Sequence, residues 1–478
     1  MPLLMIKKVG LLLGPILFLL LQQMALFSLT NEAIMVLALA AWMICWWITE
    51  AVSISVTALL PLVVFPLSGI MSVNAVGANY GSSIVFLFFG GFVLALALEK
   101  VNLHRRIALT IIHKTGTTPN RVILGFMLAT GFMSMWISNT ASTVVMLPIA
   151  LSVIQLLVQS DHEFTPEEQR FSLSVMLGIA FSANAGGIAT VIGTPPNSVL
   201  IGLLENEYNI QISFLKWMVI GLPFSMVMIG LIYLLFIKVV FPNQGILFKT
   251  TQDVIAQQLS SLGPLKSNEK QVLVVFSLMV FFWVFRTLIN SLIPSLGLTD
   301  TIISVGGAIA LFAIPSDFRR QQFVLEWKDT QRLTWGILIL FGGGLALAKG
   351  MAQTGIVAAI TEVISNADFN VLLTVTLLIS LMLFMTELMS NVALVAVLAP
   401  VMAGIAMGLE IPILYLLIPV TMASSCAFML PMATPPNAIV FASGYVKVSQ
   451  MARVGIIINL LAVFLLILLY RFAIPLVF

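Results

Sequence analysis

The sequence predicts an all-α polytopic membrane protein built from two inverted repeats. Three observations predict this fold class: an apolar composition, a series of apolar segments long enough to cross a bilayer, and two copies of the same short polar motifs. Of the 478 residues, 60% are hydrophobic and only 9% are charged, and the mean hydropathy is +1.11. Because so few charges cannot cover a soluble globule of this size, the chain is expected to lie in a bilayer.

The composition also argues against several other classes of protein. The net charge is only +3, and no block of Lys and Arg is dense enough to indicate nucleic-acid binding. Cys45 and Cys426 lie in apolar surroundings and match no metal-binding spacing, so they are interpreted as small core residues. Lys7 and Lys8 precede an apolar run that lacks a small-residue cleavage site, which favours a retained first span over a signal peptide.

The apolar segments can be counted as membrane crossings, since about 20 apolar residues cross a bilayer. Two over-long segments, 121–157 and 371–408, are predicted to be re-entrant hairpins that enter the bilayer and return to the same side. The remaining segments give about 11 transmembrane helices. These spans are expected near residues 9–29, 33–50, 52–71, 82–112, 171–204, 213–241, 271–290, 299–315, 334–364, 411–444 and 452–476.

The long polar interval at 242–270 separates the two repeats and is predicted to be a cytoplasmic linker, with a short surface helix over 251–262. The predicted organisation is a first transmembrane helix at 1–30, repeat 1 at 31–241 with its hairpin at 121–157 and a broken helix at 171–204, and repeat 2 at 271–478 with its hairpin at 371–408 and a broken helix at 411–444.

The basic residues predict the orientation of the chain. With a cytoplasmic N-terminus and non-crossing hairpins, most of the 22 Lys and Arg residues fall on the cytoplasmic side, as the positive-inside rule requires. The C-terminus is then external. The two repeats begin on opposite faces of the membrane, an inverted arrangement shared by many secondary transporters.

Three short motifs recur in the same order at nearly constant spacing. Phe89-Gly90-Gly91 recurs as Phe341-Gly342-Gly343, and Ser138-Asn139-Thr140 recurs as Ser390-Asn391-Val392, both 252 positions later. Thr194-Pro195-Pro196-Asn197 recurs 240 positions later as Thr434-Pro435-Pro436-Asn437. Two consecutive prolines remove two backbone donors and must break a helix. Paired breaks at symmetric places favour discontinuous helices that meet near the membrane midplane.

The Ser-Asn motifs are expected at the hairpin tips. Backbone that leaves a helix inside a bilayer must be buried in protein or line a watery cavity. There, helix N-termini favour an anion, and carbonyl, hydroxyl and amide oxygens favour a cation. The alternative, that the Ser and Thr residues only join helices by hydrogen bonds, is less able to explain two symmetric copies.

Two Ser-Asn-Thr-type tips, each followed by a Thr-Pro-Pro-Asn break, resemble the divalent anion:sodium symporter family, the INDY-type di- and tricarboxylate carriers, over nearly the whole chain. The resemblance implies a homodimer in the plasma membrane, here of a bacterium, in which a transport domain slides past a scaffold domain in an elevator mechanism. It implies no enzymatic activity and no cofactor other than Na⁺ as a coupling ion.

The resemblance also implies roles for individual residues. The residues expected at the carboxylates of the substrate are Ser138, Asn139, Thr140, Thr194, Pro195, Ser390, Asn391, Val392, Thr434 and Pro435. A first Na⁺ site is expected at Ser134, Ser138, Asn139 and the Gly193 carbonyl, and a second at Thr386, Met389, Asn391 and the Ala433 carbonyl.

Two departures from the family pattern bear on the mode of transport. Val392 replaces a threonine, which removes a hydroxyl, and Met389 replaces a small residue beside the second cation site. A lost hydrogen bond to a charged group costs about 1.5 to 3 kcal/mol. The second half-site is therefore predicted to be weakened, which favours dicarboxylate exchange slightly over the alternative, Na⁺-coupled symport of di- or tricarboxylates or sulfate. An intramembrane enzyme is disfavoured because no HExxH motif, acidic pair or Ser-His constellation is found.

Overall fold

The computed structural model describes residues 2–24, 29–116, 118–157, 165–240, 251–317, 322–367 and 369–478. The described chain is helical apart from one two-stranded antiparallel ladder, so the predicted all-α membrane fold is confirmed and the ladder is an unpredicted addition. Eight helices in the described ranges are long and apolar enough to cross a membrane.

The first half of the chain contains twelve α-helices and one π-helical turn within its described ranges. They are α1 (Pro2–Gln22), α2 (Asn31–Thr49), α3 (Ile54–Thr57), α4 (Leu60–Leu67), α5 (Val73–Tyr80), α6 (Ser83–Lys100), α7 (Leu103–Thr115), α8 (Pro119–Ser134), α9 (Asn139–Leu157), α10 (Pro166–Gly187), α11 (Pro195–Tyr208), α12 (Phe214–Leu235) and η1 (Phe236–Val240).

The second half repeats this order with local additions. Its elements are α13 (Thr251–Ser261), α14 (Ser267–Leu292), η2 (Pro294–Leu296), α15 (Asp300–Ala313), β1 (Pro315–Asp317), β2 (Gln322–Phe323), η3 (Trp327–Arg332), α16 (Trp335–Gln353), α17 (Ile356–Ser365), α18 (Val371–Met385), α19 (Asn391–Gly408), α20 (Ile413–Ser424), α21 (Pro435–Ala442), α22 (Val448–Leu468), η4 (Leu469–Ala473) and α23 (Ile474–Val477).

The helices begin where the sequence provides start signals. The Thr165 hydroxyl accepts from the Glu168 N–H, and the Glu168 carboxylate accepts from the Thr165 N–H at 2.8 Å, which forms a capping box for α10. The Asn370 side chain caps α18 by accepting from Leu373 N–H at 3.0 Å. Proline occupies the first helical position of α8, α10, α11 and α21, where its missing N–H has no cost.

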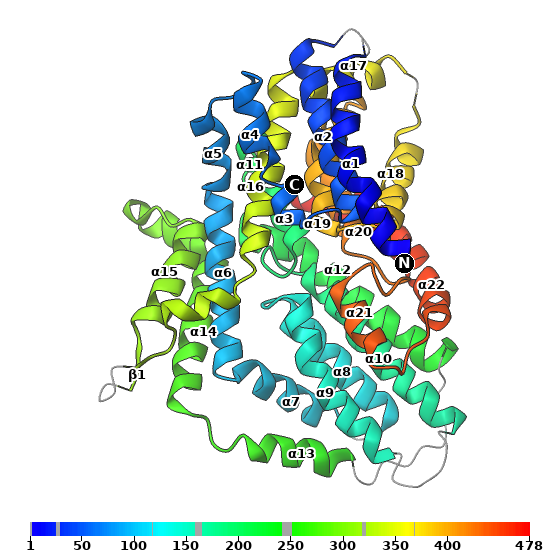
Figure 1. Cartoon of the computed structure of the whole chain (residues 1–478). Helices are drawn as coiled ribbons and strands as arrows, with labels where there is room; N and C mark the ends of the chain where they lie inside the picture. The colour runs from blue at the N-terminus through cyan, green and yellow to red at the C-terminus, as the bar shows by residue number, and fades with distance from the viewer. Residues whose placement is uncertain are drawn as a thin grey trace.

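Two helical hairpins and two broken helices pack against one another in the larger part of the apolar core. In Figure 1, α8 and α9 lie together at one end, next to α7 and α13, whereas α18, α19 and α20 lie toward the other end. Hairpin 1 (α8 and α9) packs against α10, and its arm α9 also contacts α21. Hairpin 2 (α18 and α19) packs against α20, and its arm α19 also contacts α11. Each hairpin therefore contacts both broken helices.

The buried apolar residues fall into two clusters. The larger cluster joins the hairpins and broken helices to α6, α7, α12, α14 and α22, with Phe181 and Phe428 in edge contact at 5.2 Å between ring centroids. The smaller cluster joins α2, the α3–α5 segment, α16 and α17, and includes the buried Trp47 and Phe65. Ala393 and Val397 of α19 also belong to the smaller cluster, so hairpin 2 packs against both clusters.

Several predicted segments differ from the structure. The spans predicted at 52–71, 82–112 and 334–364 are each two helices, namely α3 and α4, α6 and α7, and α16 and α17. The chain turns at Asn102 and Gly355, which both have a positive φ. The first span was predicted at 9–29, whereas α1 already ends at Gln22, because Gln22 and Gln23 interrupt the apolar run. The surface helix predicted at 251–262 is present as α13, while the start of the predicted linker, 242–250, lies outside the described residues.

Candidate functional site

Four short connecting segments carry the predicted site residues. Tip 1 (residues 135–138) joins α8 to α9, and tip 2 (386–390) joins α18 to α19. Break 1 (188–194) separates α10 from α11, and break 2 (425–434) separates α20 from α21. Each of these segments leads directly into the N-terminus of a helix. The first helical residues are Asn139, Pro195, Asn391 and Pro435.

The N-termini of α9, α11, α19 and α21 bring positive electrostatic potential to the tips and breaks. The N-terminus of a helix carries a partial positive charge and unpaired N–H groups, so it favours an anion. Within the described residues, no Lys or Arg side chain hydrogen-bonds to a residue of either tip. The arrangement therefore offers positive potential to an anion through backbone dipoles.

Break 2 is joined to α10, the helix that precedes break 1. The Asn184 side-chain amide on α10 donates to the Ala427 carbonyl at 3.0 Å and to the Thr434 hydroxyl at 3.1 Å. It also lies 3.3 Å from the Asn437 side-chain oxygen. Asn184 is fully buried, and sequence reasoning missed it because its neighbours resemble ordinary small helix-packing residues. These contacts place repeat 1 directly against break 2.

A cluster of oxygen atoms lies behind tip 1. The Ser134 hydroxyl is 2.6 Å from the Asn139 side-chain oxygen and 2.7 Å from the Ala183 carbonyl oxygen. A serine hydroxyl carries one proton and can donate it to only one of these acceptors at a time. Oxygen ligands of this kind suit a hard cation, which can use the lone pairs of all three atoms. The residues present therefore fit a small cation at this place.

Glycine keeps this cluster compact. A side chain at Gly187 would begin 2.4 Å from the Asn139 side-chain oxygen, and one at Gly193 would begin 2.9 Å from the Ser134 carbonyl oxygen. A larger residue at Gly187 would displace the Asn139 oxygen of the cluster, and one at Gly193 would displace the backbone beside the cluster. The structure thus brings together Ser134, Asn139 and Gly193, as the sequence predicted, and adds Ala183, whose main-chain contribution has no sequence signal.

A matching cluster lies behind tip 2. The Thr386 hydroxyl is 2.7 Å from the Asn391 side-chain oxygen and 2.6 Å from the Ser424 carbonyl oxygen. This geometry repeats that of Ser134, although the sequence predicted a weaker second site. Met389 is half-buried at the tip, and the Ala433 N–H donates to Leu430 at 3.2 Å. Neither Met389 nor Ala433 hydrogen-bonds to Thr386 or Asn391 within the described residues.

The asparagines of the two Thr-Pro-Pro-Asn motifs hold the breaks in shape. The Asn197 amide donates to the Thr190 carbonyl at 2.8 Å and to the Gly187 carbonyl at 3.4 Å. The Asn437 amide makes the equivalent bonds 240 positions later, to Leu430 and Ala427, each at 3.1 Å. Sequence analysis predicted the breaks from the prolines but gave these asparagines no role.

The remaining predicted residues sit at the helix starts. The Ser138 hydroxyl accepts from Ala141 N–H at 3.2 Å and the Ser390 hydroxyl from Ala393 N–H at 3.5 Å, so both cap their helices. Thr194 and Thr434 are buried N-cap residues of α11 and α21. The exposed or half-exposed residues of the motifs are Ser138, Asn139, Thr140, Pro195, Ser390, Asn391, Val392 and Pro435.

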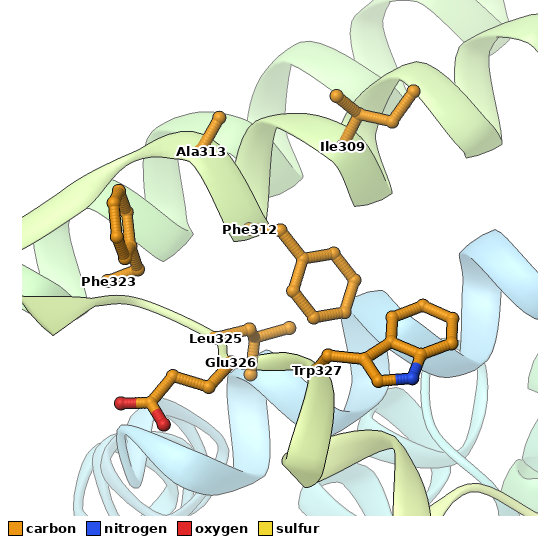
Figure 2. A pocket seen from close by; sticks show the side chains of 7 residues that line it. All are labelled: Ile309, Phe312, Ala313, Phe323, Leu325, Glu326 and Trp327. Atoms are coloured by element: carbon orange, nitrogen blue, oxygen red, sulfur yellow. The ribbon is translucent and has the colours of Figure 1, made fainter.

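Two surface cavities lie away from these motifs. One of about 520 Å³ lies between α15 and the segment that follows β2; Figure 2 shows Phe312 and Leu325 near Trp327, with the Glu326 carboxylate pointing away. The other, about 250 Å³, lies between α7, α9 and α13 and is lined by His104 and Arg105. Neither contains a tip or break residue, so the candidate site is defined by the motifs themselves.

Paired hairpins and paired broken helices in an apolar helical chain define a multi-pass membrane transporter. Two solved transporters share this fold. The YdaH transporter of Alcanivorax borkumensis has a TM-score of 0.55 and 12% identity, with 83% of this chain and 86% of that chain covered. The antimetabolite efflux pump MtrF of Neisseria gonorrhoeae has a TM-score of 0.55 and 14% identity, with 83% and 82% covered. At such identities the likeness is one of fold alone.

The sequence comparisons place the chain more narrowly. The family described as the sodium:sulfate symporter transmembrane region matches residues 6–478, and the chain belongs to this family. The sodium-dependent dicarboxylate transporter SdcS of Staphylococcus saprophyticus is 39% identical over 477 residues, which cover 98% of this chain and 92% of the relative. SdcS of Staphylococcus aureus is also 39% identical, over 479 residues with the same coverage. The resemblance inferred from the motifs is therefore confirmed.

Proposed function

We propose that this protein is a Na⁺-coupled symporter of small dicarboxylates, of the succinate, malate and 2-oxoglutarate class, in a bacterial plasma membrane. The observation that carries the proposal is the pair of oxygen clusters behind Asn139 and Asn391. Each cluster sits at the start of a helix whose N-terminus favours an anion. Substrate and cation would therefore bind next to each other on the same two asparagines.

Charge balance explains why transport would be coupled to Na⁺. A dicarboxylate brings two negative charges to a site that offers helix dipoles and no hydrogen bond from Lys or Arg among the described residues. Burying a charge without compensation is costly. Cations at the Ser134 and Thr386 clusters would supply that compensation, so dicarboxylate and Na⁺ would each increase the affinity for the other.

The sequence favours exchange slightly, because Val392 and Met389 predict a weakened second half-site. Two findings support symport instead. The Thr386 cluster has the same short oxygen distances as the Ser134 cluster, and the relatives with 39% identity are named sodium-dependent dicarboxylate transporters. Met389 leaves this geometry in place because the oxygens come from Thr386, Asn391 and Ser424.

The proposed mechanism divides the helices into a transport domain and a scaffold domain. The hairpins, broken helices and α12 and α22 would form the transport domain, and α1–α6 with α14–α16 would form a scaffold that supports it. The smaller apolar cluster joins α2, α3–α5 and α16 of the proposed scaffold, and it also includes Ala393 and Val397 of α19, where hairpin 2 packs against the scaffold. A homodimer with cytoplasmic N-termini and external C-termini, working by an elevator motion, is part of the same proposal.

Uptake into proteoliposomes tests this function directly. Empty vesicles with an inward Na⁺ gradient are expected to accumulate radiolabelled succinate, and vesicles with choline on both sides are not. Uptake that requires internal dicarboxylate and ignores Na⁺ would establish exchange and refute symport. Competition by sulfate, the anion in the family's description, is expected to be weak; strong competition would make sulfate the substrate.

A further inference from the structure

The two half-sites differ at one buried position that the proposed function does not use. Glu387 follows Thr386 directly in tip 2, and its side chain is only 3% exposed. The residue 252 positions earlier, after Ser134, is Met135. One half-site therefore contains an acid where the other contains a thioether.

Four donors converge on the Glu387 carboxylate. One oxygen accepts from the Phe428 N–H at 2.8 Å and the Met429 N–H at 3.0 Å, and the other accepts from the Leu430 N–H at 3.0 Å. The buried Asn459 amide on α22 donates to the first oxygen at 2.7 Å. Three successive N–H groups around one anionic group form a backbone nest.

This nest connects the acid to the second oxygen cluster. Residues 428–430 belong to break 2, the same segment that follows Ser424, whose carbonyl completes the Thr386 cluster. Tip 2 and break 2 are thus joined twice, by the Thr386 hydroxyl and by the Glu387 carboxylate. In repeat 1, the corresponding tie is a neutral bond from the Thr190 hydroxyl to the Met135 carbonyl at 2.6 Å.

Glu387 has no salt bridge within the described residues. Other buried acids of this chain have one: Glu269 contacts Arg106 at 3.0 Å, and Asp300 contacts Arg286 at 3.0 Å. A buried carboxylate without a basic partner needs another source of positive charge. Backbone dipoles provide part of it, and a cation at the adjacent Thr386 cluster would provide the rest.

We propose that Glu387 is a positioning residue that fixes break 2 against tip 2 and makes the second half-site the tighter of the two for Na⁺. The inference rests on the proposed function and adds the order in which Na⁺ fills the two half-sites. The Thr386 cluster gains a fixed negative charge beside it, whereas the Ser134 cluster has none. Na⁺ therefore occupies the second half-site at concentrations that leave the first largely empty.

The test compares Glu387→Gln with wild type by Na⁺-dependent thermal stabilisation and by Na⁺-dependent succinate uptake, at constant ionic strength with choline. Because the residue next to Thr386 loses its unit charge, the half-maximal Na⁺ concentration is expected to rise roughly 10- to 100-fold. Glu387→Asp keeps the charge and is expected to stay within about threefold of wild type by the same electrostatic argument.

Glu269→Gln is the matched control, since it neutralises another buried acid that is far from the tips and paired with Arg106. It is expected to lower the melting temperature without changing the half-maximal Na⁺ concentration. A Glu387→Gln variant that behaves in the same way would overturn the proposal and leave Na⁺ symport intact. If Glu387→Gln does not fold, Glu387→Asp becomes the test. A rise in its half-maximal Na⁺ concentration as large as that of Thr386→Val would overturn the proposal. Wild-type protein with no Na⁺ response at all would refute the proposed function as well.

Discussion

The two hairpin tips have the same oxygen geometry but different surroundings. At tip 1, a hydroxyl from Thr140 follows Asn139, and the neighbouring position is the neutral Met135. At tip 2, Val392 follows Asn391 and offers no hydroxyl, but Glu387 adds a buried charge. In the proposed function, tip 1 would therefore be the better site for the anion and tip 2 the better site for the cation.

The largest effect is expected from the two asparagines, because each is proposed to contact both the carboxylate and the cation. Asn139→Ala and Asn391→Ala are each expected to reduce succinate uptake by at least about 100-fold, the result of losing two charge-assisted contacts at once. Initial rates in proteoliposomes provide the measurement.

Asn290→Ala is the control for the asparagine variants. Asn290 makes two hydrogen bonds with Leu298, at 2.8 and 2.9 Å, in a connection remote from both tips. It is expected to lower stability while retaining uptake. Asparagine variants of the tips that transport at the wild-type rate would contradict the assignment of both half-sites.

A smaller effect is expected from the hydroxyls behind each tip. Ser134→Ala and Thr386→Val each remove one oxygen of a cluster and are expected to raise the half-maximal Na⁺ concentration about tenfold and to reduce the cooperativity of Na⁺ activation. Thr374 lies on α18, the helix that precedes Thr386, and its hydroxyl donates to the Asn370 carbonyl at the start of that helix. Thr374→Val is therefore expected to leave Na⁺ activation unchanged. An unchanged Na⁺ dependence in both cluster variants would argue against these cation sites.

The smallest effect is expected from exchanging the residues that follow the asparagines. Thr140→Val gives tip 1 the chemistry of tip 2 and is expected to raise the half-saturating succinate concentration about tenfold, since one hydrogen bond to a carboxylate is lost. Val392→Thr is expected to change it by less than about threefold, in the direction of tighter binding, because a hydroxyl is added where none is required. Equal responses of the two variants would mean that the tips do not differ in their use of the anion.

The sequence predicted those parts of the fold that depend on local chemistry. Pro195 and Pro435 marked the broken helices, and the spacing between Asn139 and Asn391 revealed the repeat. These signals are visible because proline and polar residues inside an apolar segment constrain the backbone directly.

The parts that the sequence did not predict are contacts made by main-chain atoms or across the repeats. The carbonyl groups of Ala183 and Ser424 complete the oxygen clusters, yet any residue type could supply a carbonyl there. Asn184 joins α10 to break 2 across about half of the chain, and the Glu387 carboxylate accepts hydrogen bonds from break 2. The prediction that tip 2 is weakened considered only Val392 and Met389, and it did not include the oxygen atoms of Thr386, Asn391 and Ser424 that lie together there.

The most direct test of the account is equilibrium binding of succinate to the purified protein with and without Na⁺. Two tips without a basic side chain are predicted to hold a dicarboxylate only when cations occupy the adjacent oxygen clusters. Binding should therefore be strong in Na⁺ and lost in choline at the same ionic strength, and saturating succinate should lower the half-maximal Na⁺ concentration in return. Succinate that binds with the same affinity in choline as in Na⁺ would contradict the account.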